Sequence, residues 1–220
     1  MAVIVKKPEI NLREELTDLR NQPRYAEQQF WMDGLVTNGT FDTSTGWTLD
    51  TGWSINVGGF LQKASGSNNA KAATTPVSFV NGRQYRAVFD YTDLGSDIRF
   101  GYGTSATYAG LNANPTVLSG TGTKTINFTV GFDGGYLGFH GNDASVGQID
   151  DLYVFETDGT DIVHRLPRGW KPTRVYEDGL LQREGASDDY EVVYDGFDYF
   201  VKPAVAPSAT TQTCVIGVKA

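Results

Sequence analysis

Residues 80–91 read Val-Asn-Gly-Arg-Gln-Tyr-Arg-Ala-Val-Phe-Asp-Tyr, and they give the clearest indication of the fold. From Tyr85 onward, apolar and polar side chains largely alternate, which is typical of a strand with one buried face. Similar short runs, separated by turns rich in Gly, Asn and Asp, occur at residues 53–57, 98–102, 124–130, 136–139 and 152–155. Because no helical stretch separates these runs, they predict two antiparallel sheets packed face to face.

Composition divides the 220 residues into three segments. Residues 36–158 hold 19 of the 26 glycines but only 17 of the 44 charged residues, so this part differs from both flanks. The predicted organisation is an N-terminal arm with a short helix at 1–35, a central β-sandwich at 36–158 and a small C-terminal β unit at 159–220. The expected fold class is therefore mainly β, and the chain is long enough to bury a sizeable core.

The first segment predicts a short amphipathic helix. Asn11 can cap its start and Glu14 stands at the capping-box position, while Leu12, Leu16 and Leu19 form one apolar stripe. A helix this short needs a partner surface in order to be stable. Two interpretations stay open, namely an arm that anchors the protein to another one and a helix that packs on its own domain.

The third segment contains two hairpin signals. An Asp-Gly pair lies at the expected turn both within residues 175–181 and within residues 190–197. A further strand is expected at 214–218, and Cys214, the single cysteine, is expected to be an inert thiol in its buried face. The segment therefore predicts a compact unit of about five strands, which at this size needs contact with the sandwich or with another subunit.

Charge and hydropathy exclude two classes of partner. The formal net charge of −8 argues against nucleic-acid binding, which depends on clustered Lys and Arg. The sequence has neither a long apolar run nor a secretory signal pattern, so we expect no membrane span and no export by that route. Synthesis in a reducing cytoplasm fits the absence of cysteine pairs, and release from the cell would then need another route, such as lysis.

Three stretches resemble the jelly-roll carbohydrate-binding modules that bind xylan and glucan. The first is Leu35-Val36-Thr37-Asn38-Gly39-Thr40-Phe41-Asp42 followed by Gly46-Trp47, the second is residues 80–91, and the third is Gly147-Gln148-Ile149-Asp150-Asp151-Leu152-Tyr153-Val154. The resemblance covers residues of about 35–157, and it implies a jelly roll with a sugar-binding surface. It also implies that Trp47 lies in the core.

The same resemblance implies a structural calcium ion. In that family the acidic residue of the opening motif and an aspartate of the last strand often hold the ion, which here means Asp42 with Asp150 or Asp151. Carboxylate oxygens suit this hard cation, and the ion would join the two ends of the module. The alternative is that these aspartates only occupy turns or cap strand ends.

Glycan recognition by such folds uses aromatic faces together with a few polar side chains. The candidate carbohydrate-binding residues are Tyr102, Tyr108, Tyr136, His140 and Asn112. Tyr102, Tyr108 and His140 are expected to be exposed. Other aromatic and amide side chains of the segment, namely Trp53, Asn114 and Asn142, are further candidates.

No catalytic constellation can be assembled, so we expect no enzymatic activity. The only histidines, His140 and His164, are 24 positions apart in a chain with one cysteine. Asp150 and Asp151 are adjacent, and neighbouring residues of a strand point to opposite faces, whereas glycoside hydrolysis needs two carboxylates that face one bond.

Both ends of the chain resemble structural proteins of tailed bacteriophages. Residues 5–14 are similar to N-terminal arms of such proteins, and residues 175–197 to small β units of fibre and head-decoration proteins. The resemblance implies a virion component that binds other virion proteins through its arm and host surface polysaccharide through its jelly roll. It also implies a homo-oligomer, with a trimer as the first expectation. The alternatives are a capsid decoration or cement protein that binds no sugar, and an accessory module of a polysaccharide-degrading system.

Overall fold

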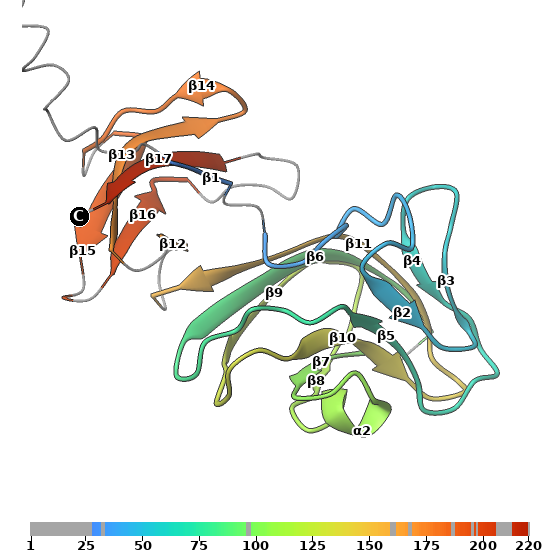
Figure 1. The fold of residues 1–220 in the computed structure, drawn as a ribbon. Coiled ribbons are helices and arrows are strands. Elements are labelled where there is room, and N and C mark those ends of the chain that lie inside the picture. The colour runs from blue at the N-terminus through green and yellow to red at the C-terminus, as the bar shows by residue number, and fades with distance from the viewer. Residues whose placement is uncertain are drawn as a thin grey trace, which may run out of the picture.

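The structure is a computed structural model that describes residues 28–31, 34–95, 98–158, 162–166, 169–185, 188–194, 196, 198–205 and 213–219. These residues are almost entirely in strands, turns and bends, and they form a jelly-roll sandwich joined to a smaller β unit (Figure 1). The mainly β fold class predicted from the sequence is confirmed. No helix among the described residues is long and apolar enough to cross a membrane.

The jelly roll consists of two five-stranded antiparallel sheets. The first has the order β2 (Trp47–Leu49), β5 (Ala70–Thr74), β10 (Tyr136–Gly141), β7 (Arg99–Gly103) and β8 (Thr116–Val117). The second has the order β3 (Trp53–Ile55), β4 (Leu61–Lys63), β11 (Val146–Thr157), β6 (Gln84–Gly95) and β9 (Gly122–Thr129). Strands that neighbour each other in space are often far apart in sequence, as in a jelly roll.

The core lies between these two sheets, and every second side chain of β6 from Tyr85 to Tyr91 points into it. Tyr85, Ala87, Phe89 and Tyr91 are buried between the sheets, whereas the residues between them face outward or are partly exposed. Burial of these large side chains is the main stabilising contribution to the sandwich. Trp47 belongs to the same core, as predicted.

A short helix, α2 (Tyr108–Leu111), covers the outer face of the first sheet. Thr107 caps its start by accepting a hydrogen bond from the backbone amide of Gly110. Below it lie Gly101 and Gly103 of β7, where a Cβ atom would overlap the carbonyl oxygens of Leu111 and Gly110 respectively. The two glycines therefore allow the helix backbone to lie directly on the sheet.

The smaller unit is built from two sheets that use both ends of the chain. One has the order β1 (Gln28–Trp31), β17 (Thr213–Lys219), β13 (Trp170–Glu177) and β14 (Leu180–Leu181). The other has the order β12 (His164–Arg165), β16 (Tyr199–Pro203) and β15 (Tyr190–Tyr194). Their shared core contains Leu166, Val175, Tyr190, Val201 and Val215. Cys214 is also buried, as predicted.

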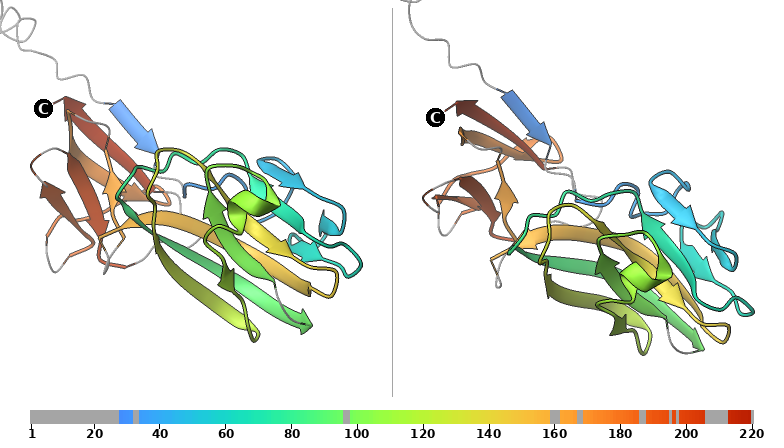
Figure 2. Two further views of the ribbon diagram at one scale, coloured as in Figure 1. Left: turned by 90° about the horizontal axis from the view of Figure 1, so that it is seen from below. Right: turned by 60° about the horizontal axis from the view of Figure 1, so that its bottom comes forward.

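Strand β1 falls within the predicted N-terminal arm. It pairs antiparallel with β17, from Gln28 opposite Gly217 to Trp31 opposite Cys214, and Figure 2 shows the two strands side by side. Residues 28–31 thus form part of the C-terminal sheet. The helix predicted from Asn11 lies outside the described residues, and the anchoring role of the arm stays a prediction.

The first predicted hairpin is present. Strands β13 and β14 pair through Tyr176 with Leu181 and Glu177 with Leu180. The two turn residues, Asp178 and Gly179, have φ angles of 49° and 80°. Positive φ at both positions is what a two-residue turn of type I′ requires, and it explains the Asp-Gly sequence.

Candidate functional site

An open groove lies where β7 and β8 of the first sheet approach β9 of the second. Its volume is about 670 Å³. The lining residues are Gln84, Tyr102, Ala113, Asn114, Pro115, Thr116, Asn127, Phe128 and Thr129. We call it the Tyr102 groove, and it combines two aromatic rings with three side-chain amides.

Tyr102 is held in this groove by a contact between aromatic rings and by a hydrogen bond from its hydroxyl group. It lies on the core-facing side of β7, and its ring centroid is 4.5 Å from that of Phe128. Its hydroxyl donates a hydrogen bond of 3.3 Å to the carbonyl oxygen of Thr129. Burial raises the pKa of the Tyr102 hydroxyl, so this group remains a hydrogen-bond donor at neutral pH.

The amide side chains come from three different elements. Asn127 lies on edge strand β9, and its Oδ1 atom accepts a 2.8 Å hydrogen bond from Nε of Arg86 on β6. Asn114, in the loop before β8, donates through Nδ2 to the carbonyl oxygen of Tyr102 at 3.5 Å. Gln84 begins β6 and is exposed. Amides that both donate and accept suit ligands with many hydroxyl groups.

The outward face of β9 continues this polar surface. Thr123, Thr125, Asn127 and Thr129 are all exposed, whereas Ile126 and Phe128 between them pack against the core. A strand presents alternate residues to one face, so the four polar side chains form a row. Of the groove residues, Gln84 and Asn127 are absent from the predicted set. The Thr-Lys-Thr-Ile-Asn-Phe-Thr alternation of residues 123–129 is a signal that could have indicated Asn127, whereas Gln84 has no such signal.

The other predicted sugar-binding residues lie elsewhere, on the outer face of the first sheet. His140 of β10 faces α2, and its ring is 5.1 Å from that of Tyr108 in a T-shaped arrangement. Tyr136 lies on the same face of β10, four residues before His140. Asn112 forms the C-cap of α2. Both tyrosines are half-buried. The five predicted residues therefore occupy two separate places, and only Tyr102 lines the groove.

The prediction that His140 is exposed is wrong. Its side chain is 1% exposed, because α2 closes over the glycine-rich part of β7 and β10. Neither ring nitrogen has a hydrogen-bond partner among the described residues. Burial, with the nearby positive charge of Arg99, lowers the pKa of His140 to about 4, so the ring is neutral at physiological pH. A ligand could reach it only if α2 moved.

The predicted calcium residues lie around a bulge in β11. The pairing of β11 with β6 shifts register between Asp150 and Tyr153, and Asp151 has a positive φ of 48°. The carbonyl oxygen of Gly39 accepts a hydrogen bond from the amide of Leu152 in the bulge, which joins the opening segment to the last strand. The two ends of the jelly roll thus meet here, as the family resemblance implies.

The acidic side chains partly fit a calcium ion. Burial raises the pKa of the Asp150 carboxyl, and the charges of Asp151, Asp90 and Asp42 raise it further, whereas a hydrogen bond from the Asp151 amide opposes the shift. However, the described residues contain no group of three or more His, Cys, Asp or Glu side chains that could hold a metal ion. Since calcium takes six to eight oxygen ligands, backbone carbonyls and water would have to supply most of them.

Comparison with known proteins gives distant structural likenesses. No family model matches the chain, and no curated protein matches it. A carbohydrate-binding module of family 4 is 14% identical and has a TM-score of 0.41, over 56% of this chain and 99% of that one. The second N-terminal cellulose-binding domain of Cellulomonas fimi β-1,4-glucanase C is 21% identical, with a TM-score of 0.42 over 57% of this chain and 95% of that one.

A phage protein also shows structural likeness. Tailspike protein 4 of bacteriophage CBA120, in its enzymatically active domain, is 12% identical and has a TM-score of 0.38, over 56% of this chain and 21% of that one. The functional argument therefore depends on the residues of this chain.

The junction between the jelly roll and the C-terminal unit is a network of charges. The guanidinium of Arg165 on β12 donates to both carboxylate oxygens of Glu156 on β11, at 2.7 and 3.3 Å, and to Asp198 at 2.6 Å. It also lies 4.1 Å from the ring centroid of Phe200. Such two-pronged, partly buried contacts are geometrically specific. They define how the last strand of the jelly roll meets the smaller unit.

Proposed function

We propose that this chain is a non-catalytic glycan-binding protein exposed on the surface of a tailed-bacteriophage particle. The observation that carries the glycan-binding part is the Tyr102 groove, in which an aromatic side chain and three amides surround an open hollow of about 670 Å³. Sugars present both apolar C–H surfaces and hydroxyl groups, and this combination of side chains can contact both.

The lining of the groove also supports a binding role without catalysis. Among the described residues, those that line it include no Asp, Glu or His side chain. Glycoside hydrolysis requires a pair of carboxylates on either side of the bond that breaks. The groove residues therefore favour retention of a glycan over its cleavage.

Glycan binding is tested by affinity electrophoresis of the full chain. The gels contain soluble β-glucan, xylan, galactomannan or polysaccharide extracted from bacterial cell surfaces. We expect retardation by at least one polymer, and we expect Tyr102→Ala and Asn127→Ala to abolish it. Asn127 is exposed, so its variant should fold even if Tyr102→Ala does not.

The matched control for these variants is Tyr194→Ala. Tyr194 is 55% exposed in the C-terminal unit and lies outside the Tyr102 groove. Its variant should migrate like the unmodified chain. If no polymer retards the unmodified chain, glycan binding is refuted. The favoured function is then that of a decoration protein that stabilises the particle without binding sugar.

The phage setting is proposed from the resemblance of both chain ends to virion proteins. Many copies on one particle would turn weak sugar binding into firm adhesion to the host. Synthesis in the host cytoplasm, assembly as a homo-oligomer and attachment through the arm belong to the same proposal. A chain that lacks residues 1–27 retains β1, so we expect it to fold but not to copurify with particles.

The control for the arm replaces residues 1–27 with a Gly/Ser-rich segment of equal length. This chain should also fail to copurify, because the arm acts through its sequence and not its bulk. Copurification of either variant at the level of the full chain would contradict an anchoring role.

We also propose that Ca²⁺ binds near Asp42 and Asp150. Support comes from the meeting of the jelly-roll ends at this point and from the preference of calcium for carboxylate oxygen. Added Ca²⁺ should raise the melting temperature by about 3 °C, whereas Mg²⁺ should not, and Asp42→Asn should remove the rise. Equal melting curves in Ca²⁺ and in chelator would exclude a stabilising ion.

A further inference from the structure

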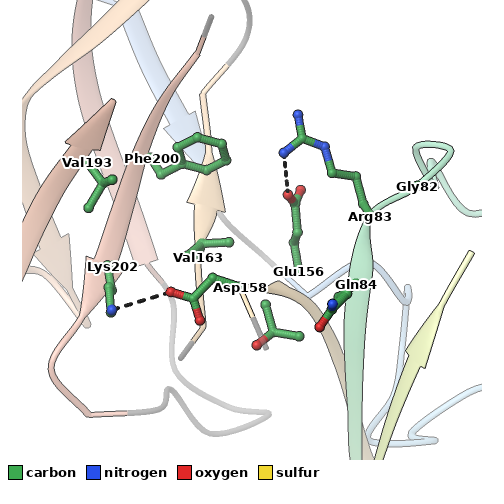
Figure 3. A pocket seen from close by; sticks show the side chains of 10 residues that line it. Gly82, Arg83, Gln84, Glu156, Asp158, Val163, Val193, Phe200 and Lys202 are labelled. Atoms are coloured by element: carbon green, nitrogen blue, oxygen red, sulfur yellow. Dashed lines mark hydrogen bonds and ion pairs between the residues drawn. The ribbon is translucent and has the colours of Figure 1, made fainter. Parts of the chain in front are cut away.

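A second hollow lies between the jelly roll and the C-terminal unit (Figure 3). We call it the inter-unit cleft, and its volume is about 300 Å³. One wall comes from residues 82–84 and 156–158 of the jelly roll. The other comes from the C-terminal unit, where Val163, Val193 and Phe200 form an apolar side and Lys202 a polar one. Hollows of this kind, apolar with a few polar groups and placed between two units, are common ligand sites.

Gln84 connects this cleft to the Tyr102 groove, because it lines both hollows. In the sheet, Gln84 lies opposite Thr129 of β9 on one side and opposite Thr157 of β11 on the other. Thr129 lines the groove and Thr157 lines the cleft. Since neighbouring strands are spaced about 4.8 Å apart, these three positions bridge roughly 10 Å between the two hollows.

The charges in the cleft are balanced. Nη1 of Arg83 is 3.7 Å from Oε1 of Glu156, and Nζ of Lys202 is 3.4 Å from Oδ2 of Asp158. Each positive side chain therefore has a negative one beside it, so the cleft has no excess charge to attract a polyanion. A guanidinium has five N–H donors and a carboxylate accepts up to about four hydrogen bonds, so such pairs can also bind hydroxyl groups.

From this arrangement we propose that the inter-unit cleft is a second saccharide subsite, so that one neutral glycan chain extends from the Tyr102 groove, past Gln84, into the cleft. The proposal rests on the glycan-binding function proposed above. It adds that the C-terminal unit takes part in recognition through Val193, Phe200 and Lys202, and that the ligand is a neutral polysaccharide longer than the groove alone can hold.

The test uses Val193→Arg in the full chain. Val193 is 37% exposed at the cleft, so a long side chain there should obstruct the hollow while the core stays intact. The matched control is Val57→Arg, which makes the same change at a fully exposed position in the turn between β3 and β4, outside both hollows. Thermal unfolding checks that both variants are folded.

Binding is measured by titration calorimetry with the neutral polymers β-glucan, xylan and galactomannan and with their oligomers of two to eight sugars. For the unmodified chain, affinity should increase with oligomer length. Val193→Arg should bind the longest oligomers and the polymer about tenfold more weakly, and its affinity for the shortest oligomers should be unchanged. Val57→Arg should bind all of them with the affinity of the unmodified chain.

The outcomes separate this inference from the function on which it rests. If Asn127→Ala abolishes binding but Val193→Arg binds long chains normally, the cleft is not a subsite and the Tyr102 groove still is. If the unmodified chain binds none of the neutral polymers, the inference is overturned. Affinity that falls steeply between 50 mM and 500 mM salt would indicate a charged glycan and contradict the neutral one, because neutral contacts are insensitive to screening.

Discussion

His140 is a titratable side chain that the fold keeps uncharged. Its pKa is lowered to about 4 by burial and by Arg99, compared with 6.5 in an unfolded chain. Between these two values the unfolded state binds more protons than the folded state, so folding stability falls as the pH decreases. The stability present above pH 6.5 is lost progressively as the pH approaches 4.

The predicted size of this effect is about 2 kcal/mol of unfolding free energy between pH 7 and pH 5. Urea unfolding of the unmodified chain and of His140→Phe at these two pH values measures it. The variant keeps a ring of similar shape but cannot titrate, so its stability should depend less on pH by that amount. An equal loss of unfolding free energy in both proteins between pH 7 and pH 5 would mean that α2 does not shield His140 from protons.

At the scale of elements, α2 depends on the glycines beneath it. Gly101→Ala would place a methyl group against the carbonyl oxygen of Leu111, and the glycine has no positive φ that would add backbone strain. Lifting the helix should cost about 1–3 kcal/mol of unfolding free energy. The matched control is Gly131→Ala, since a Cβ at Gly131 meets nothing within 4 Å. Urea unfolding should separate the two variants clearly, and equal stability would show that α2 is loosely held.

The sequence predicts single elements well and their long-range pairing poorly. The alternation around Tyr85 and the Asp178-Gly179 turn are local signals, so the sheets and the first hairpin could be predicted. The pairing of β1 with β17 joins residues that are nearly 190 positions apart, and the sequence of β1 has no local feature that specifies such a partner. The arm was therefore predicted to extend to residue 35.

The same distinction applies to the candidate site. Tyr102 could be predicted because aromatic side chains are typical of sugar sites, but an aromatic in a strand can face either way. Tyr108 and His140 were grouped with it because their sequence does not reveal that a short helix folds back over its own sheet. Gln84 and Asn127 have ordinary polar side chains, and only the assembled sandwich places them beside Tyr102.

On the scale of the whole molecule, Arg165 connects the two units. It contacts Glu156 of the jelly roll and Asp198 of the C-terminal unit, and all three side chains are less than 20% exposed. Arg165→Ala would leave two partly buried carboxylates without this cation. We expect a loss of about 2 kcal/mol of unfolding free energy, with the C-terminal unit melting before the jelly roll in calorimetry.

The control for Arg165 is Arg183→Ala. Arg183 contacts Asp188 and Asp189, but its side chain is 74% exposed, so its ion pairs should contribute little. Its variant should give the melting curve of the unmodified chain. A single, unshifted transition for Arg165→Ala would show that the two units are held together by other contacts.

The position of β1 also determines how the molecule would bear a mechanical load. A particle would hold the chain before Gln28, and a glycan in the proposed inter-unit cleft would hold the C-terminal unit that contains β17, so tension would pass from β1 to β17 along the axis of β1. Hydrogen bonds between antiparallel strands are perpendicular to that axis, so a pull of this kind shears all the β1–β17 bonds together and does not open them one at a time. The short strand would thus resist detachment under flow more strongly than its four residues suggest.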